Sequence, residues 1–167
     1  MPDGQSIRPS LGVSVLAQGA YAPPLTLLLA GLDITELDLA QETVSVRAGF
    51  LRFLIQEFAR LLPFDPAFYG RAYPDVEAAR LVGDVPSLHA HFVVQGYFER
   101  RQPCAMAFDP AEYAALYPDL TRAFDPADIY ALRAHFVGHG WQEGRVGVAA
   151  QAAEAERWLT AAQPRRR

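Results

Sequence analysis

The chain contains no lysine and only one cysteine, Cys104. The absence of lysine excludes chemistry that needs a lysine amine, such as Schiff-base catalysis. A single cysteine excludes a disulfide within the chain. The formal net charge is −4, which gives no general reason to bind nucleic acid. We therefore expect no nucleic-acid partner.

Long apolar runs are also missing. The longest, around Leu27–Ala30, is too short to cross a bilayer. Residues 1–20 lack the charged start, apolar core and cleavage site of a secretory signal. These absences predict a protein made in the cytoplasm without a signal peptide or membrane span. If it reaches a surface, another route must take it there.

What the chain does contain is one stretch that occurs twice, at 64–101 (copy one) and 108–145 (copy two). Each copy opens with Phe-Asp-Pro-Ala-x-Tyr, continues with Tyr-Pro-Asp, and closes with His-Phe-Val-x-x-Gly-aromatic-x-Glu-x-Arg. Every pairing keeps the same offset, 44 residues (108 minus 64), without a gap. A fixed period in this range indicates a repeated supersecondary unit.

Local rules predict three short helices in each copy. Asp65 is a good N-cap with proline at the first helical position, and Pro74 should end that helix at Tyr73. For the third helix we expect a cap at Asp84 or Ser87 in copy one. In copy two we expect Asp125, followed by Pro126, to cap the third helix. Gly96 and Gly140 are expected to end the third helices in the left-handed backbone conformation.

The repeat resembles a short bacterial module, Phe-Asp-x-x-x-Tyr … Tyr-Pro-Asp-[Val/Leu] … His-[Tyr/Phe] … Gly-x-x-Glu-Gly-Arg, which recurs beside glycosyltransferase domains and in large surface or secreted proteins. Copy two matches throughout its closing motif, Gly140 to Arg145. Copy one departs from the pattern at Arg100, where the module has glycine. The resemblance covers roughly half of the chain and implies no enzymatic activity.

The size and the two-copy layout also resemble a head-spike component of an alphaproteobacterial gene transfer agent, which is a phage-like particle. This second resemblance implies a location on the particle surface. It also implies contact with the capsular polysaccharide of the recipient cell.

The N-terminal region has a different pattern. Residues 1–24 are punctuated by glycine and proline and resemble an extended arm, in which alternation at Val13 and Val15 allows a short strand. Residues 25–46 alternate apolar and polar positions and predict short β-strands, which do not stand alone in water. We therefore expect this region to serve assembly through Leu25, Leu27, Leu29, Leu37, Leu39, Val44 and Val46.

Residues 48–62 switch to a helical period with an aromatic stripe that is typical of a core-facing helix. The overall prediction is an α+β fold: an N-terminal arm and short β segment, followed by a mainly helical half with two tandem repeats. The expected divisions are 1–46 (arm and β assembly region), 47–63 (linking helix), 64–103 (repeat one), 104–147 (repeat two) and 148–167 (C-terminal helix and basic tail).

Candidate catalytic and metal sites find little support. His135 and His139 have metal-compatible spacing, but three or four converging ligands are normally needed. The repeated aspartates, such as Asp65 and Asp109, are explained by helix caps. No Gly-x-Ser-x-Gly elbow or phosphate-binding glycine loop is present in the sequence. We predict a non-enzymatic protein without cofactor or metal.

The recurring aromatics are more informative. Tyr69, Tyr73, Tyr113 and Tyr117 suit a core with bonded hydroxyls. Tyr97 and Trp141 follow the third helix in each copy, in loops of the kind that often carry binding residues. The predicted carbohydrate- or partner-binding residues are Tyr97, Glu99, Arg101, Trp141, Glu143 and Arg145. The competing interpretation is that Glu and Arg pair internally and the aromatics cover the neighbouring copy.

Two functions remain. One is a structural and binding subunit of a surface appendage, such as a head spike or fibre, that forms homo-oligomers, joins other particle proteins and contacts surface or capsular polysaccharide. The other is an accessory module that works with a glycosyltransferase in polysaccharide synthesis. The assembly region favours the first.

Overall fold

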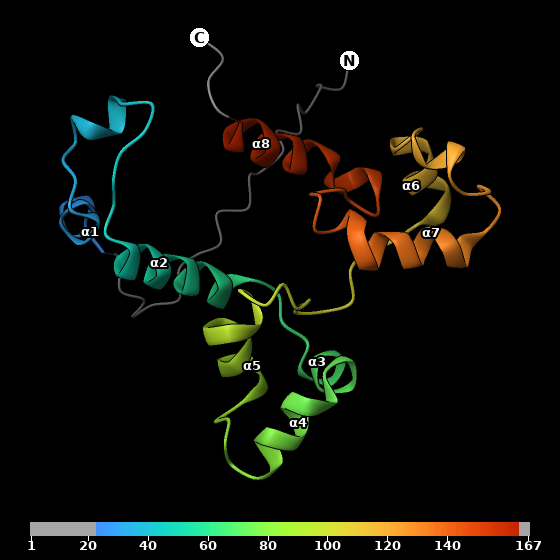
Figure 1. Cartoon of the computed structure of the whole chain (residues 1–167), viewed down its shortest axis with the longest axis horizontal. Coiled ribbons are helices and arrows are strands. Elements are labelled where there is room, and N and C mark those ends of the chain that lie inside the picture. The colour runs from blue at the N-terminus through green and yellow to red at the C-terminus, as the bar shows by residue number, and fades with distance from the viewer. Residues whose placement is uncertain (1–22, 164–167) are drawn as a thin grey trace, which may run out of the picture.

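The computed structural model describes residues 23–163. Helices and turns make up its regular structure, and none of these residues forms a named strand (Figure 1). One isolated bridge joins Phe108 to Gly147. The α+β prediction is therefore wrong, and the fold of the described part is mainly α-helical.

The error lies in residues 25–46. Leu25–Leu32 forms helix α1 and Asp38–Ala40 a 3₁₀ turn. The alternating leucines lie within a run that also contains Leu28, and leucine is a strong helix former. A helix satisfies its own backbone groups, whereas a short isolated strand leaves them without partners. The strand suggested at Val13 and Val15 lies outside the described residues.

The linking helix is confirmed as α2, Ala48–Leu61, which ends just before Pro63. Its aromatic stripe is only partly covered, because Phe53 and Phe58 keep 47% and 39% of their surface exposed. Only Ala59 is fully buried on this helix. The expectation of a core-facing stripe therefore holds only in part.

Copy one consists of three helices that run into a π-turn. They are α3 (Pro66–Ala72), α4 (Pro74–Leu81) and α5 (Leu88–His91), continued by Phe92–Gly96. The Asp65 carboxylate accepts hydrogen bonds from Ala67 N and Phe68 N, at 2.9 and 3.0 Å, as predicted. Ser87 caps α5 by accepting a bond from Ala90 N.

Copy two follows the same course. It consists of α6 (Pro110–Leu116), a 3₁₀ turn (Leu120–Arg122) and α7 (Ile129–His135), continued by the π-turn Phe136–Gly140. The N-cap of α7 is Asp128, which accepts a bond from Ala131 N. The prediction of Asp125 was wrong: its carboxylate instead accepts a bond from Ala127 N in the preceding loop.

Each copy closes on itself and has its own core. The amide of Asp65 donates to the carbonyl of Pro103, and the amide of Asp109 donates to the carbonyl of Gly147. Buried residues of copy one gather around Tyr69 and Phe92, and those of copy two around Tyr113 and Phe136. The shared motif therefore specifies two separate small cores.

The C-terminal segment forms a 3₁₀ turn, Ala149–Gln151, and helix α8, Ala152–Ala162. The ring of Trp158 on α8 lies 5.9 Å from that of Phe58 on α2. This contact joins α2, which precedes copy one, to α8, which follows copy two. None of the described helices is long and apolar enough to cross a membrane.

Candidate functional site

Most of the repeated motif builds the copies themselves. The Tyr69 hydroxyl lies 3.0 Å from His91 Nδ1, and the Tyr113 hydroxyl lies 3.0 Å from His135 Nδ1. Burial raises the pKa of Tyr113 to about 12 and also raises the pKa of Tyr69. Both phenols therefore stay neutral and act as core hydrogen-bonding groups, as the sequence predicted.

Gly96 and Gly140 have a different role from the one predicted. Neither has a positive φ, because both lie within the π-turns. A Cβ atom at Gly96 would collide with the Tyr69 hydroxyl, and one at Gly140 with that of Tyr113. Glycine is required so that the backbone can approach the buried phenol.

The positive φ angles occur four residues later. Gly144 has φ 80° and Arg100, its counterpart in copy one, has φ 61°. The turn therefore forms in copy one without glycine. A left-handed arginine costs roughly 1–2 kcal/mol relative to a relaxed backbone. Observed strain of this kind is often associated with a functional site.

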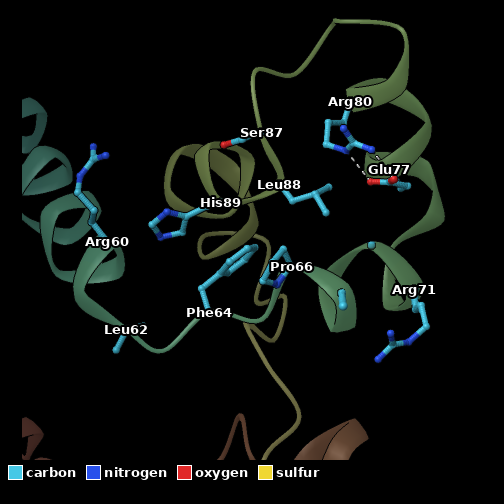
Figure 2. Close-up of a pocket in the computed structure, with 12 residues that line it drawn as sticks. Arg60, Leu62, Phe64, Pro66, Arg71, Glu77, Arg80, Ser87, Leu88 and His89 are labelled. Atoms are coloured by element: carbon cyan, nitrogen blue, oxygen red, sulfur yellow. Dashed lines mark hydrogen bonds and ion pairs between the residues drawn. The ribbon is translucent and has the colours of Figure 1, made fainter.

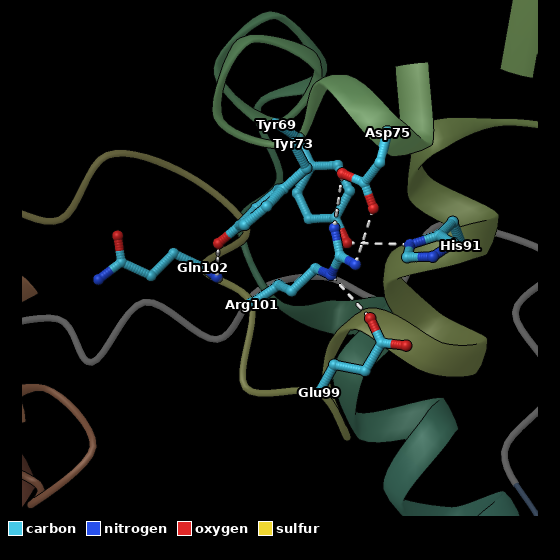
Figure 3. A network of polar contacts seen from close by, with 7 residues as sticks. All are labelled: Tyr69, Tyr73, Asp75, His91, Glu99, Arg101 and Gln102. Carbon is cyan, nitrogen blue, oxygen red and sulfur yellow. Dashed lines mark hydrogen bonds and ion pairs between the residues drawn. The ribbon is translucent and has the colours of Figure 1, made fainter. Parts of the chain in front are cut away.

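The closing Glu and Arg of each copy pair internally. Arg101 bonds both Asp75 oxygens, at 3.2 and 3.0 Å, and also Glu99 at 2.7 Å (Figure 3). The Tyr73 ring lies under this guanidinium, 4.8 Å away, and its hydroxyl accepts a bond from Gln102 N at 2.7 Å.

Copy two repeats this arrangement. Arg145 contacts Asp119 at 2.9 Å and Glu143 at 2.8 Å, above the ring of Tyr117. We call these two sets the repeat networks. The carboxylates are largely exposed, so water screens each ion pair and its contribution to stability is small. The networks fix the course of the chain as it leaves each copy.

A groove joins the loops of the two copies. It encloses about 630 Å³ and is lined by Tyr97 and Arg100 from copy one and by His139, Trp141, Gln142 and Glu143 from copy two. We call it the inter-copy groove. Tyr97 and Trp141 are corresponding residues of the two copies, since 97 plus 44 is 141. The repeat thus places two equivalent aromatics in one cavity.

Three of the predicted site residues line this groove: Tyr97, Trp141 and Glu143. Glu99, Arg101 and Arg145 do not line it and belong to the repeat networks. Sequence reasoning missed Arg100, His139 and Gln142 as lining residues. The signal for Arg100 was present, since it is the position where copy one departs from the glycine of the module.

Both groove aromatics are partly buried. Tyr97 packs on the core of copy one, 5.9 Å from the Phe92 ring, and Trp141 packs on the core of copy two. Arg100 is exposed, and its side chain has no hydrogen bond or ion pair within residues 23–163, although its backbone amide donates to the carbonyl of Tyr97 at 3.1 Å. The groove therefore combines two aromatic rings that are packed on the cores, those of Tyr97 and Trp141, with the Arg100 guanidinium, which has no partner among the described residues.

A second cavity lies within copy one. It encloses about 830 Å³ between the end of α2 and helices α3, α4 and α5 (Figure 2). Phe64, Pro66 and Leu88 form an apolar surface in it, and arginines lie at its edges.

Metal binding gains no support from this geometry. His135 and His139 have ring centroids 6.0 Å apart, and Nδ1 of His135 is engaged by Tyr113. Residues 23–163 hold no group of three or more histidine, cysteine or acidic side chains placed to bind a metal ion.

Comparison of the chain with protein-family models, curated proteins and solved structures found no match.

Acidification is expected to weaken copy one. Burial, followed by the nearby Arg101, lowers the pKa of His91 below its ordinary 6.5. Its contribution to stability is therefore complete above pH 6.5 and is lost as the pH falls through the lowered folded value. The pKa of Asp75 is also lowered, chiefly by its bonds to Arg101, so a second loss follows below about pH 4.

Melting curves between pH 7.5 and 3.5 measure this dependence. The loss between pH 7 and 5 should shrink in His91→Gln, whose amide oxygen can still accept a bond from Tyr69. An unchanged pH profile in that variant would assign the dependence to other groups.

Proposed function

We propose that the chain is a non-enzymatic subunit of a surface appendage, a head spike or fibre of a phage-like particle, that contacts bacterial surface or capsular polysaccharide through the inter-copy groove. The observation that carries the proposal is the meeting of Tyr97 and Trp141 in one cavity with Arg100, Gln142 and Glu143. Aromatic rings stack on the apolar faces of sugars, and the polar groups bond their hydroxyls. Loops held by a rigid scaffold are common binding surfaces.

The arrangement of charges is consistent with this role. The Arg100 side chain offers five N–H donors that have no partner among the described residues, while Glu143 bonds Arg145 through one oxygen and can accept a bond from a hydroxyl at the other. An arrangement of donors and acceptors beside aromatic rings suits a polyhydroxylated ligand.

The central test is binding to capsulated and capsule-free cells. We expect the full-length protein to bind capsulated cells and Trp141→Ala to lose at least about tenfold in affinity. Because Trp141 also packs on the core of copy two, its removal should cost roughly 2–4 kcal/mol. Binding is therefore measured well below the melting temperature of the variant.

Trp158→Ala is the matched control. Trp158 is the other tryptophan, is 59% exposed on α8 and does not line the inter-copy groove, although it shares a neighbouring cavity with Trp141. It should leave cell binding unchanged. Two results would contradict the proposal. In one, the wild-type protein binds capsulated and capsule-free cells equally well. In the other, Trp141→Ala binds capsulated cells as tightly as the wild type does.

The proposed assembly role of residues 1–46 rests on exposed apolar side chains. Leu37 is 82% and Leu39 58% exposed, and Leu25 and Leu27 are about half exposed. Leu29, by contrast, is buried in α1. Exposed leucines that are this close in sequence favour contact with another subunit.

The variant Leu37→Glu/Leu39→Glu tests this role in the full chain. Both side chains are exposed, so the melting temperature of the isolated chain should change little. The mass in solution should fall from an oligomer to a monomer. Unchanged mass would contradict assembly through this segment, and a wild-type monomer would favour the accessory-module alternative.

A further inference from the structure

The cavity within copy one has features that copy two lacks. We define the arginine pocket by Arg60, Phe64, Arg71, Arg80, Leu88 and His89, which line it together with smaller residues (Figure 2). At about 830 Å³ it is larger than the inter-copy groove. Cavities of this size are typical of small-molecule sites.

Copy two carries different side chains at several of the positions that line this pocket. Its counterpart of Arg80 is Phe124 (80 plus 44), which packs on the core and lies 5.4 Å from the His135 ring. The counterpart of Gly70 is Ala114, which is also packed on that core. The residues that line the pocket in copy one are therefore not a requirement of the repeat, since copy two folds with others in their place.

Gly70 helps to keep the pocket open. A Cβ atom there would lie 3.2 Å from Leu88 Cδ1 and 3.4 Å from Glu77 Oε2. The apolar surface beneath consists mainly of Phe64 and Leu88, and the Phe64 ring lies 4.8 Å from that of His89. This surface suits the flat face of a ring.

The charges around the pocket leave one positive charge without a partner. Arg80 bonds Glu77 at 2.7 and 2.8 Å, and Arg60 bonds Glu57 at 3.2 Å. Arg71 has no carboxylate partner among residues 23–163. In copy two the counterpart of Arg71 is Ala115. The unbalanced charge matches a monoanion.

His89 forms part of the wall of the pocket. His89 Nε2 is buried and has no hydrogen-bond partner within the described part of the chain. Because this nitrogen is closed to solvent, a ligand in the open cavity would reach it only after a shift of the His89 ring. In copy two arginine replaces this histidine, and its guanidinium lies over the Phe108 ring at 5.5 Å.

We propose that the arginine pocket binds a ring-shaped monocarboxylate, with the ring against Phe64 and Leu88 and the carboxylate toward the arginines. The source of such a group is either a uronic-acid sugar or a free cyclic organic acid. The site uses none of the residues of the inter-copy groove and does not depend on the function proposed for it.

Titration of the isotope-labelled full-length protein with galacturonate, benzoate and galactose tests the site by NMR. A small ring acid should bind with a dissociation constant of roughly 1 mM. Shifts should centre on the amides of Gly70, Arg71 and His89. Galactose, which lacks the carboxylate, should bind at least about tenfold more weakly. Preference for galacturonate identifies a sugar, and preference for benzoate a free organic acid.

Two variants make the proposal falsifiable. Glu77→Thr/Arg80→Phe installs the copy-two residues and should abolish binding while the protein stays folded. Arg71→Ala changes only an exposed side chain and should weaken binding at least about fivefold, whereas Arg122→Ala, an exposed arginine of copy two, should not. Saturable carboxylate binding that survives both pocket variants would overturn the assignment, as would no binding to wild type.

Discussion

Replacement of Gly140 by alanine is expected to be among the most damaging single changes in copy two. The new methyl group would meet the Tyr113 hydroxyl, which is fully buried and bonded to His135. Neither the π-turn nor the tyrosine can move without opening the core. The cost should be about 3 kcal/mol or more, in the upper range for point substitutions. Thermal and urea unfolding measure it.

Gly138→Ala is the matched control, two residues away in the same π-turn. A Cβ atom there has no neighbour within 4 Å. Because alanine favours helical geometry over glycine, this change should be neutral or stabilising by up to about 1 kcal/mol.

A double variant isolates the cause. Tyr113→Phe removes the hydroxyl that the methyl group would meet, so Gly140→Ala should cost less in that background than alone. A coupling of about 1 kcal/mol or more is expected. Strict additivity would show that the loss at Gly140 arises elsewhere. The same cycle applies to Gly96 and Tyr69 in copy one.

Arg100→Gly is expected to stabilise the fold and weaken the proposed function at once. Glycine accepts the left-handed φ of 61° without strain, as Gly144 does in copy two. The gain should be about 1 kcal/mol, or roughly 2–4 °C in melting temperature. The variant also removes the unengaged guanidinium from the inter-copy groove, so binding to capsulated cells should fall about tenfold.

Because Arg100→Gly is expected to raise stability and to lower binding, the test separates a structural role from a binding role. A purely structural arginine would show the gain in stability with unchanged binding, which would contradict a role in the groove. Arg100→Lys is the control: it keeps the charge and the strained backbone, so it should leave stability unchanged and lose only part of the binding.

Sequence reasoning succeeded where a residue acts on its neighbours. The Asp65 cap, the Ser87 cap and the end of the first repeat helix before Pro74 depend on contacts within a few residues, and such rules are local. The hydroxyl partners of the four core tyrosines could not be read from the sequence, because they lie 22 and 29 residues away. They depend on how the helices pack.

The errors have equally specific causes. A leucine at every second position of 25–29 matched a strand, but the run is short and leucine also favours a helix. Glycine before an aromatic matched a helix end at Gly96 and Gly140. The structure uses these glycines for a close approach between segments, which no local pattern reveals. The 44-residue offset identified Tyr97 and Trp141 as equivalent positions, but it did not predict that the two would line one groove.

The closing bonds of the two copies have a mechanical consequence. The chain enters copy one at Asp65 and leaves at Pro103, and these residues are joined by a bond of 3.0 Å; copy two is tied in the same way at 2.9 Å. A force that pulls on the two ends of the chain therefore acts on these closing hydrogen bonds before it acts on the helices. Once a tie parts and the small core that it closes unfolds, the 38 residue steps from Asp65 to Pro103 (103 minus 65) can extend to roughly 130 Å of chain. An appendage built from such units would lengthen in steps under shear instead of breaking.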